Sequence, residues 1–124
     1  MKRTMESSIY IPDNALDAFE RKDYDLVVKL AMPHAIRGNS DAQTTVALLY
    51  QSGLGVERDV LEAERWLLKA AEQNNPVAWN NLGTLYALKL PELKHRWSDA
   101  MKWYEKVKAL WLNVAEPYPP PSGP

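Results

Sequence analysis

The chain has 124 residues, a length that suits one domain with a single buried core. Its 15 Lys and Arg residues nearly balance its 16 Asp and Glu residues, so the net charge gives no reason to expect a nucleic acid or an anionic membrane as partner. Cysteine is absent, which excludes disulfides, thiolate metal sites and cysteine nucleophiles.

The opening residues, MKRTMESSIYIP, contain two basic residues with no apolar stretch behind them. We therefore expect residues 1–12 to be an N-terminal leader without a secretory signal. No run of 18 apolar residues occurs, so no membrane-spanning helix is expected. These features predict a cytoplasmic protein, or a periplasmic one if a leader has been removed.

Residues 13–39 predict an abbreviated first hairpin of two helices. The first helix is short and carries Leu16 and Phe19, and a tight turn follows it. Asp23 is placed to cap the second helix, which carries Val27 on its apolar face.

Residues 40–75 predict the first complete pair of helices, joined by the loop YQSGLGVERD. Their apolar residues have the spacing of amphipathic helices. The two sets are Ala42, Val46, Leu49 and Tyr50, and Ala63, Trp66, Leu67, Ala70 and Ala71. Gly53 suits a left-handed cap that ends the first helix, and Asp59 is placed to cap the second. A helix rather than a strand precedes the glycines and the P-loop lysine is missing, so the loop is predicted to be a turn and not a phosphate cradle.

The same pattern returns about 36 residues later, over residues 76–115. The matching apolar residues are Ala78, Leu82, Leu85 and Tyr86, and then Ala100, Trp103, Tyr104 and Val107. A divergent loop, LKLPELKHRWSD, replaces the glycine loop, and the last helix is expected to begin near Ser98. Gly83 is predicted at a close approach of the paired helices, where Ala should be nearly neutral. The repeat predicts an all-α fold, a short α-solenoid of antiparallel helix hairpins (an α/α superhelix), within a single domain over 13–115.

Residues 116–124 predict a proline-rich tail. Pro117 should stop the last helix, and two PxxP spacings follow. Such spacings would suit docking into an aromatic-lined groove of another protein, while a solvated tail is the simpler interpretation.

The first complete repeat resembles the Sel-one-like repeat, a relative of the tetratricopeptide repeat. The resemblance is carried by the G.GV..D loop and by KAAEQ at the close of the second helix. These residues are Gly53, Gly55, Val56 and Asp59, and Lys69-Ala70-Ala71-Glu72-Gln73. The second repeat keeps Leu82-Gly83 and Leu85-Tyr86 without the glycine loop. The resemblance covers residues 14–110 and implies scaffolding and protein binding rather than a reaction.

No catalytic, cofactor-binding or metal-binding constellation is predicted, and we expect the protein not to be an enzyme. His34 lies on an apolar stripe with no second His or carboxylate three or four residues away, so a packed histidine is expected there. His95 lies between two basic residues in the divergent loop, where a solvated side chain is expected. The carboxylates around Asp59 complement the positive end of a helix dipole.

A concave groove lined by the first helix of each repeat is predicted to bind a partner. Its six residues are Thr44, Leu48, Gln51, Asn80, Thr84 and Ala87. These small and polar side chains with one leucine would suit an extended peptide or a helix of another protein. A solvated inner face without a ligand is the alternative.

Two tryptophans, Trp66 and Trp103, occupy matched positions and are predicted to be core. Trp111 lies on the last helix, in ALWLNV, with no following repeat to cover it. Either the C-terminal segment folds back over it, or another chain covers it. The second alternative makes Trp111 an end-surface contact and predicts a homo-oligomer through the C-terminal helix.

We therefore expect a protein–protein interaction module, an adaptor or scaffold that binds another protein through its groove, with no cofactor. The alternative is an immunity-type or inhibitor protein that occludes a toxin or enzyme. Small Sel-one-like proteins, especially bacterial ones, resemble both adaptors and inhibitors. An adaptor should co-purify with several components of an assembly, and an inhibitor with one dominant toxin or enzyme.

Overall fold

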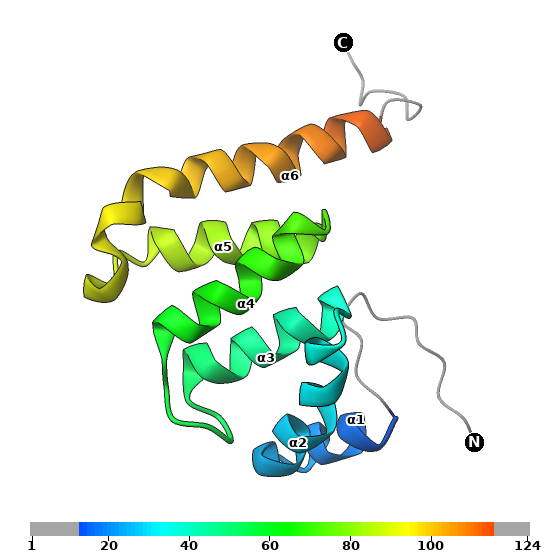
Figure 1. The fold of residues 1–124 in the computed structure, drawn as a ribbon. Helices are drawn as coiled ribbons and strands as arrows, with labels where there is room; N and C mark the ends of the chain where they lie inside the picture. The colour runs from blue at the N-terminus through cyan, green and yellow to red at the C-terminus, as the bar shows by residue number, and fades with distance from the viewer. Residues whose placement is uncertain (1–12, 116–124) are drawn as a thin grey trace. The chain divides into compact units, whose positions relative to one another are not determined.

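The structure is a computed structural model that describes residues 13–115, in which the described chain forms six α-helices, one 3-10 helix and no strand. The helices are α1 (Asp13–Glu20), α2 (Tyr24–Ile36), α3 (Ser40–Ser52), α4 (Val60–Glu72), α5 (Pro76–Ala87), the 3-10 helix η1 (Pro91–Asp99) and α6 (Ala100–Ala115) (Figure 1). The predicted all-α fold is confirmed. The predicted leader and proline-rich tail lie outside the described residues.

The chain divides into two compact units, whose described parts are residues 13–78 (unit 1) and 79–115 (unit 2). In unit 1, α2 packs against both α1 and α3, and α3 packs against α4. Unit 2 contains most of α5 together with η1 and α6. The single domain over 13–115 stays a prediction.

The apolar stripes predicted for unit 1 form its core. Ala42, Val46 and Leu49 of α3 are at most 2% exposed, and Trp66 of α4 is 8% exposed. Tyr50 is half-buried. Many of the other core positions are alanines, which let neighbouring helices approach closely; they are Ala31, Ala35, Ala63, Ala70 and Ala71.

Aspartates 36 residues apart begin the second helix of each hairpin in unit 1. Asp23 Oδ1 accepts a hydrogen bond from the Leu26 backbone N–H at 3.4 Å, and Asp59 Oδ1 accepts one from the Glu62 N–H at 3.0 Å. Each bond satisfies a backbone donor that has no partner within the helix. Both predicted caps are confirmed.

Asn39 and Asn75, which stand 36 residues apart, directly precede α3 and α5, the first helices of the two predicted complete repeats. Asn39 Oδ1 accepts from the Ala42 N–H at 2.8 Å, and Asn75 Oδ1 accepts from the Val77 N–H at 2.9 Å. Asn75, which is 7% exposed, also donates its side-chain amide to Asp41 Oδ1 at 2.7 Å. The second asparagine therefore joins the start of α5 to the start of α3 as well as capping a helix.

We predict that Asn75→Ala destabilises the fold more than its counterpart Asn39→Ala. Asn39→Ala removes a cap and should cost about 1 kcal/mol. Asn75→Ala also leaves the half-buried carboxylate of Asp41 without this donor, so the total should be about 2–3 kcal/mol. Urea unfolding of both variants measures the difference, and equal losses would show that the Asn75–Asp41 bond contributes nothing.

The loop between α3 and α4 packs back on the first hairpin. Gly53 ends α3 in the left-handed conformation, with φ of 71° and its N–H donating to the Leu49 carbonyl, as predicted. Leu54 and Val56 pack against a buried cluster formed by Ala18, Val27 and Leu49. In Figure 1 the loop runs from the end of α3 toward α2 before it returns to α4.

Gly55 lies where this loop meets the backbone of α2. Its φ is 74°, and a Cβ built on it would collide with the Tyr24 carbonyl oxygen and lie 2.6 Å from the Tyr24 carbonyl carbon and 3.0 Å from Val28 Cγ2. Only glycine fits this place. The Gly-x-Gly pair is therefore a structural turn, as predicted, whose second glycine permits close backbone packing.

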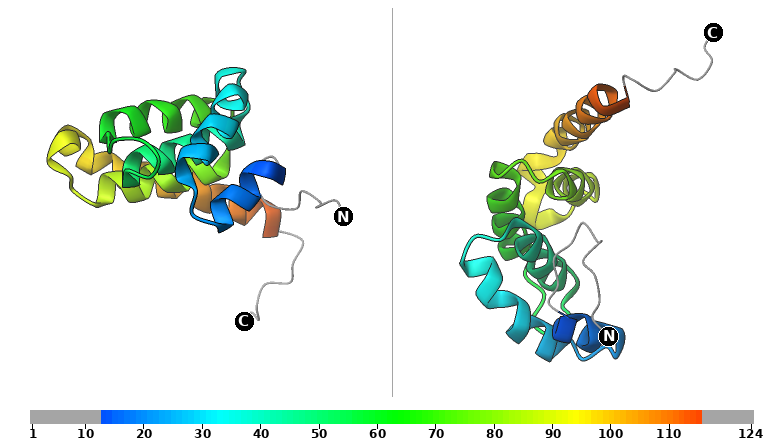
Figure 2. Two further views of the ribbon diagram at one scale, coloured as in Figure 1. Left: turned by 90° about the horizontal axis from the view of Figure 1, so that it is seen from below. Right: turned by 90° about the vertical axis from the view of Figure 1, so that its right-hand side faces the viewer.

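In unit 2 the segment that replaces the glycine loop is helical. The sequence predicted a loop, but Pro91–Asp99 forms η1, and its Leu93 is fully buried (Figure 2, left, where η1 lies at the turn between α5 and α6). The last helix, α6, begins at Ala100, close to the expected start near Ser98, and η1 runs directly into it. The buried Leu93 anchors this segment, as the partly buried Leu54 and Val56 anchor the glycine loop of unit 1.

Lys89 stands 36 residues after Gly53 and keeps the same backbone conformation, with φ of 56°. A side chain is strained in this region, so Lys89→Gly should stabilise the protein by up to about 1 kcal/mol. Thermal unfolding followed by circular dichroism measures the gain. Lys102→Gly, at an exposed position within α6, should cost about 1 kcal/mol instead. A loss at both positions would contradict the strain at Lys89.

The second stripe of unit 2 is less buried than its counterpart in unit 1. Trp103, Tyr104 and Val107 of α6 are half-buried, so the prediction of Trp103 as core is wrong. Gly83 does face α6, but a Cβ there would lie 2.6 Å from Tyr104 Cε1. Alanine would have to displace this half-buried ring, so its predicted neutrality at Gly83, which stays a prediction, requires that Tyr104 moves at little cost.

Candidate protein-binding surface

The predicted groove residues of unit 1 lie on α3, and the structure exposes only part of them. Leu48 is 38% exposed and Gln51 is half-buried. Thr44 is fully buried, and its Oγ1 donates to the Asp41 carbonyl at 2.7 Å. Thr44 therefore presents no side chain to a partner, and its assignment to an open groove is corrected.

The reason for this difference is that α3 is buried on most of its circumference. Gln43 and Thr45 are also less than 5% exposed, at 4% and 2%. Gln43 Nε2 donates to the Ala35 carbonyl at 3.1 Å, and Thr45 Oγ1 donates to the Asp41 carbonyl at 3.1 Å. Because backbone carbonyls satisfy these side chains, polarity in α3 does not mark exposure.

The predicted groove residues of unit 2 lie on α5 and all reach the surface. Asn80, Thr84 and Ala87 are exposed. Thr84 Oγ1 lies 3.0 Å from the Tyr104 hydroxyl, so one hydrogen bond ties this face of α5 to α6. A ligand on this face would meet three small or polar side chains beside a tyrosine.

The predicted end surface on α6 is exposed. Trp111 and Leu112 are each 64% exposed, and Met101, near the start of the helix, is 63% exposed. Large apolar side chains with this exposure are typical of contact surfaces. Trp111 is therefore accessible to a partner.

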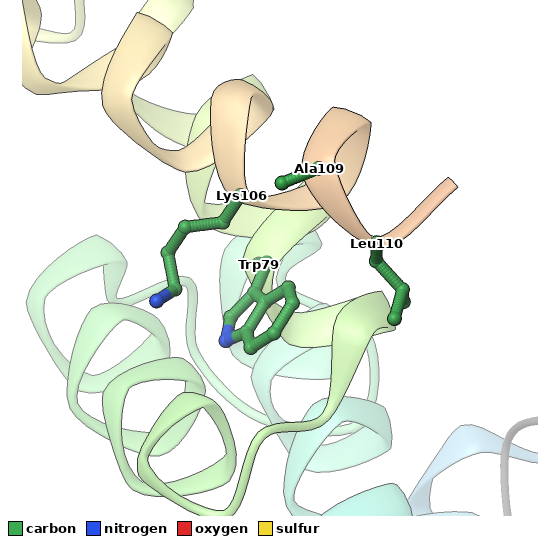
Figure 3. Close-up of a pocket in the computed structure, with 4 residues that line it drawn as sticks. All are labelled: Trp79, Lys106, Ala109 and Leu110. Carbon is green, nitrogen blue, oxygen red and sulfur yellow. The ribbon is translucent and has the colours of Figure 1, made fainter. Parts of the chain in front are cut away.

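A pocket that the sequence did not predict lies between α5 and α6. It has a volume of about 250 Å³ and is lined by Trp79, Lys106, Ala109 and Leu110 (Figure 3). The Lys106 ammonium lies 4.8 Å from the centroid of the Trp79 ring, a cation–π geometry. An apolar side chain next to a carboxylate would fit an indole wall with a lysine at its edge. The pocket depends on how two helices pack, which neither helix's periodicity reveals.

No metal centre is formed within residues 13–115, where His, Asp and Glu never gather in a group of three or more that could hold an ion. His34 is half-buried and His95 is exposed. None of the described helices combines the length and the hydropathy that a membrane span requires.

Comparison with known proteins places the chain in a repeat family. The Sel1 repeat family model matches residues 40–75, which comprise α3, the glycine loop, α4 and the turn that follows. The crystal structure of a Sel1 repeat protein from Oxalobacter formigenes is similar in fold, with a TM-score of 0.61 and 33% sequence identity over 68% of this chain and 34% of that chain. The chain thus spans about a third of that protein's length. No curated protein is significantly similar in sequence. The glycine loop, the two capped hairpins of unit 1 and these two matches together identify the chain as a Sel1-like repeat protein.

Proposed function

We propose that this chain is a protein-binding module that holds a partner protein within an assembly, as an adaptor or scaffold. The Sel1 repeat match supports this proposal, because repeats of this family generally bind other proteins and are generally not catalytic.

The exposure of Leu48 is the observation that best supports the proposed site. Leu48 is a large aliphatic side chain within the matched repeat, 38% exposed on a helix whose neighbouring positions are nearly all buried. Gln51 follows one turn later and is half-buried. An apolar residue beside an amide suits a partner's helix or extended peptide, which would bury the leucine and hydrogen-bond the glutamine. The exposed Asn80, Thr84 and Ala87 are the corresponding proposed contacts on α5.

Arginine at the proposed contacts should weaken binding without unfolding the protein. A partner that docks on Leu48→Arg, Ala87→Arg must desolvate two charges, so its affinity should fall at least about tenfold, or about 1.4 kcal/mol. The partner is first identified by co-purification from the native cell, and its affinity is then measured by calorimetry. Circular dichroism and melting temperature should change little.

Leu61→Arg is the matched control. Leu61 is 49% exposed on α4, so the same substitution there adds a surface charge outside the proposed site. This variant should bind the partner normally. If both variants bind with native affinity, the site lies elsewhere, and α6 with its exposed Trp111 becomes the next candidate.

The co-purification also separates the two roles. Several components of one assembly would support an adaptor. One dominant toxin or enzyme, inactive in the complex, would support the inhibitor instead.

A further inference from the structure

The nearly neutral chain carries its charges unevenly. Residues 13–78 contain seven Lys and Arg residues and eleven Asp and Glu residues, a net charge of −4. Residues 79–115 contain six Lys and Arg residues and three Asp and Glu residues, a net charge of +3. The described part of unit 1 is therefore acidic and that of unit 2 is basic. Opposite charges on two units favour contacts between unlike units of separate molecules.

The outer face of α6 is the repeat counterpart of residues that are buried on α4 and in the turn after it. Met101 and Leu112 stand 37 residues after Glu64 and Asn75, in the register that aligns Trp103 with Trp66. Glu64 and Asn75 are 4% and 7% exposed, whereas Met101 and Leu112 are 63% and 64% exposed. The second repeat thus leaves open a face that is covered in the first, and apolar residues occupy it.

The same helix is basic. Lys102 and Lys108 are exposed along α6, against one exposed carboxylate, Glu105, whereas Lys106 lies over Trp79 of α5. An occupant of this face should therefore be acidic as well as partly apolar. In a helical repeat, the element that follows the second helix of a hairpin is the first helix of the next hairpin.

Helix α1 has these properties. It is the first helix of its hairpin, with Ala15 and Ala18 fully buried in unit 1. Away from these alanines it presents the exposed carboxylates of Asp17 and Glu20, and Leu16 is half-buried. Asp17 pairs with Arg21 at 3.2 Å, but both side chains are more than half exposed. This ion pair is therefore weak, and Asp17 can pair with a cation of another molecule instead.

We propose that α6 of one molecule docks α1 of a second copy, so that the protein associates head to tail. Leu16 of the second copy would lie against Met101, and the carboxylates of its Asp17 and Glu20 would face Lys102 and Lys108. The two surfaces differ, so the contact is heterologous and can extend beyond a dimer. Its exposed charge pairs are screened by salt, which makes the association salt-dependent.

Sedimentation of the full chain tests this proposal. At low ionic strength, the weight-average mass should rise above the 14.1 kDa of the monomer as concentration increases from about 10 µM to about 1 mM. It should fall back toward the monomer when NaCl is raised from roughly 50 mM to roughly 500 mM. A monomer at every concentration and salt would overturn the proposal.

Charge reversal identifies the two surfaces. Asp17→Lys, Glu20→Lys alters α1, and Lys102→Glu, Lys108→Glu alters α6; Lys106 is left intact because it lies over Trp79. Each variant alone should associate at least about tenfold more weakly than the native chain. Mixing the two variants should restore association, because each altered surface then meets one of opposite charge. Circular dichroism checks that both variants keep their helices.

Two other outcomes would overturn the α1–α6 contact. If the α1 variant associates as the native chain does while the α6 variant does not, the interface joins two α6 helices. If Met101→Asp leaves association unchanged, the contact does not cover the outer face of α6. If Met101→Asp associates at least about tenfold more weakly than the native chain, this result supports docking on that face.

Discussion

Gly55→Ala should destabilise the protein by about 2–5 kcal/mol, because it combines about 1–2 kcal/mol for a side chain in the left-handed region with about 1–3 kcal/mol for overpacking. The added methyl would meet the Tyr24 carbonyl, and backbone atoms cannot rotate away as a side chain can. The loop would have to lift from α2 and expose Leu54 and Val56. Urea unfolding at equilibrium gives the loss.

Gly38→Ala separates the two contributions to this loss. Gly38 also has positive φ, at 104°, but a Cβ there would meet nothing within 4 Å. Its replacement should therefore cost only the backbone strain, about 1–2 kcal/mol. If Gly55→Ala costs no more than Gly38→Ala, the loop adapts, and the close contact with Tyr24 is not a constraint on the sequence.

Much of the fold could be predicted because local rules decide it. Helical spacing of apolar residues located the hairpins of unit 1, and side-chain caps at Asp23 and Asp59 fixed where two helices begin. Gly53 ended α3 as its preference for positive φ predicts. Each of these features depends on a few neighbouring residues, so sequence alone contains the information.

The features that sequence reasoning missed depend on distant neighbours. Thr44 was predicted on the surface because it lies opposite the apolar stripe of its helix, yet α3 is enclosed and the Asp41 carbonyl accepts a hydrogen bond from the hydroxyl. The effect of alanine at Gly83 depends on a tyrosine ring 21 residues away in sequence. The pocket beside Trp79 likewise requires α6 to lie against α5.

The candidate binding surface shows the same limit. Periodicity placed Leu48, Asn80, Thr84 and Ala87 away from the core stripe, and the structure leaves all four exposed. Exposure at these four positions follows from the pattern, but recognition depends on a partner's shape and charge. Even the charge of the whole chain misleads, because its near neutrality hides an acidic and a basic unit.

Trp66→Ala should cost about 3–5 kcal/mol, the range for removing a large aromatic side chain from a core. Trp66 is 8% exposed and lies on the apolar face of α4. Its loss therefore leaves a cavity that the surrounding helices cannot readily fill. Its counterpart Trp103→Ala provides the matched control. Trp103 is half-buried, so the same substitution should cost clearly less, about 1–2 kcal/mol.

Trp66→Phe then distinguishes packing from hydrogen bonding. Trp66 Nε1 is buried and has no hydrogen-bond partner within the described chain. Phenylalanine removes this unsatisfied donor, whose burial costs about 1–3 kcal/mol, while it leaves a smaller cavity than alanine does. The two effects oppose each other, so Trp66→Phe should lie within about 1.5 kcal/mol of the native protein in urea unfolding. A loss close to that of Trp66→Ala would mean that the indole N–H is satisfied in solution, for example by a buried water, and that this bond contributes to the stability of unit 1.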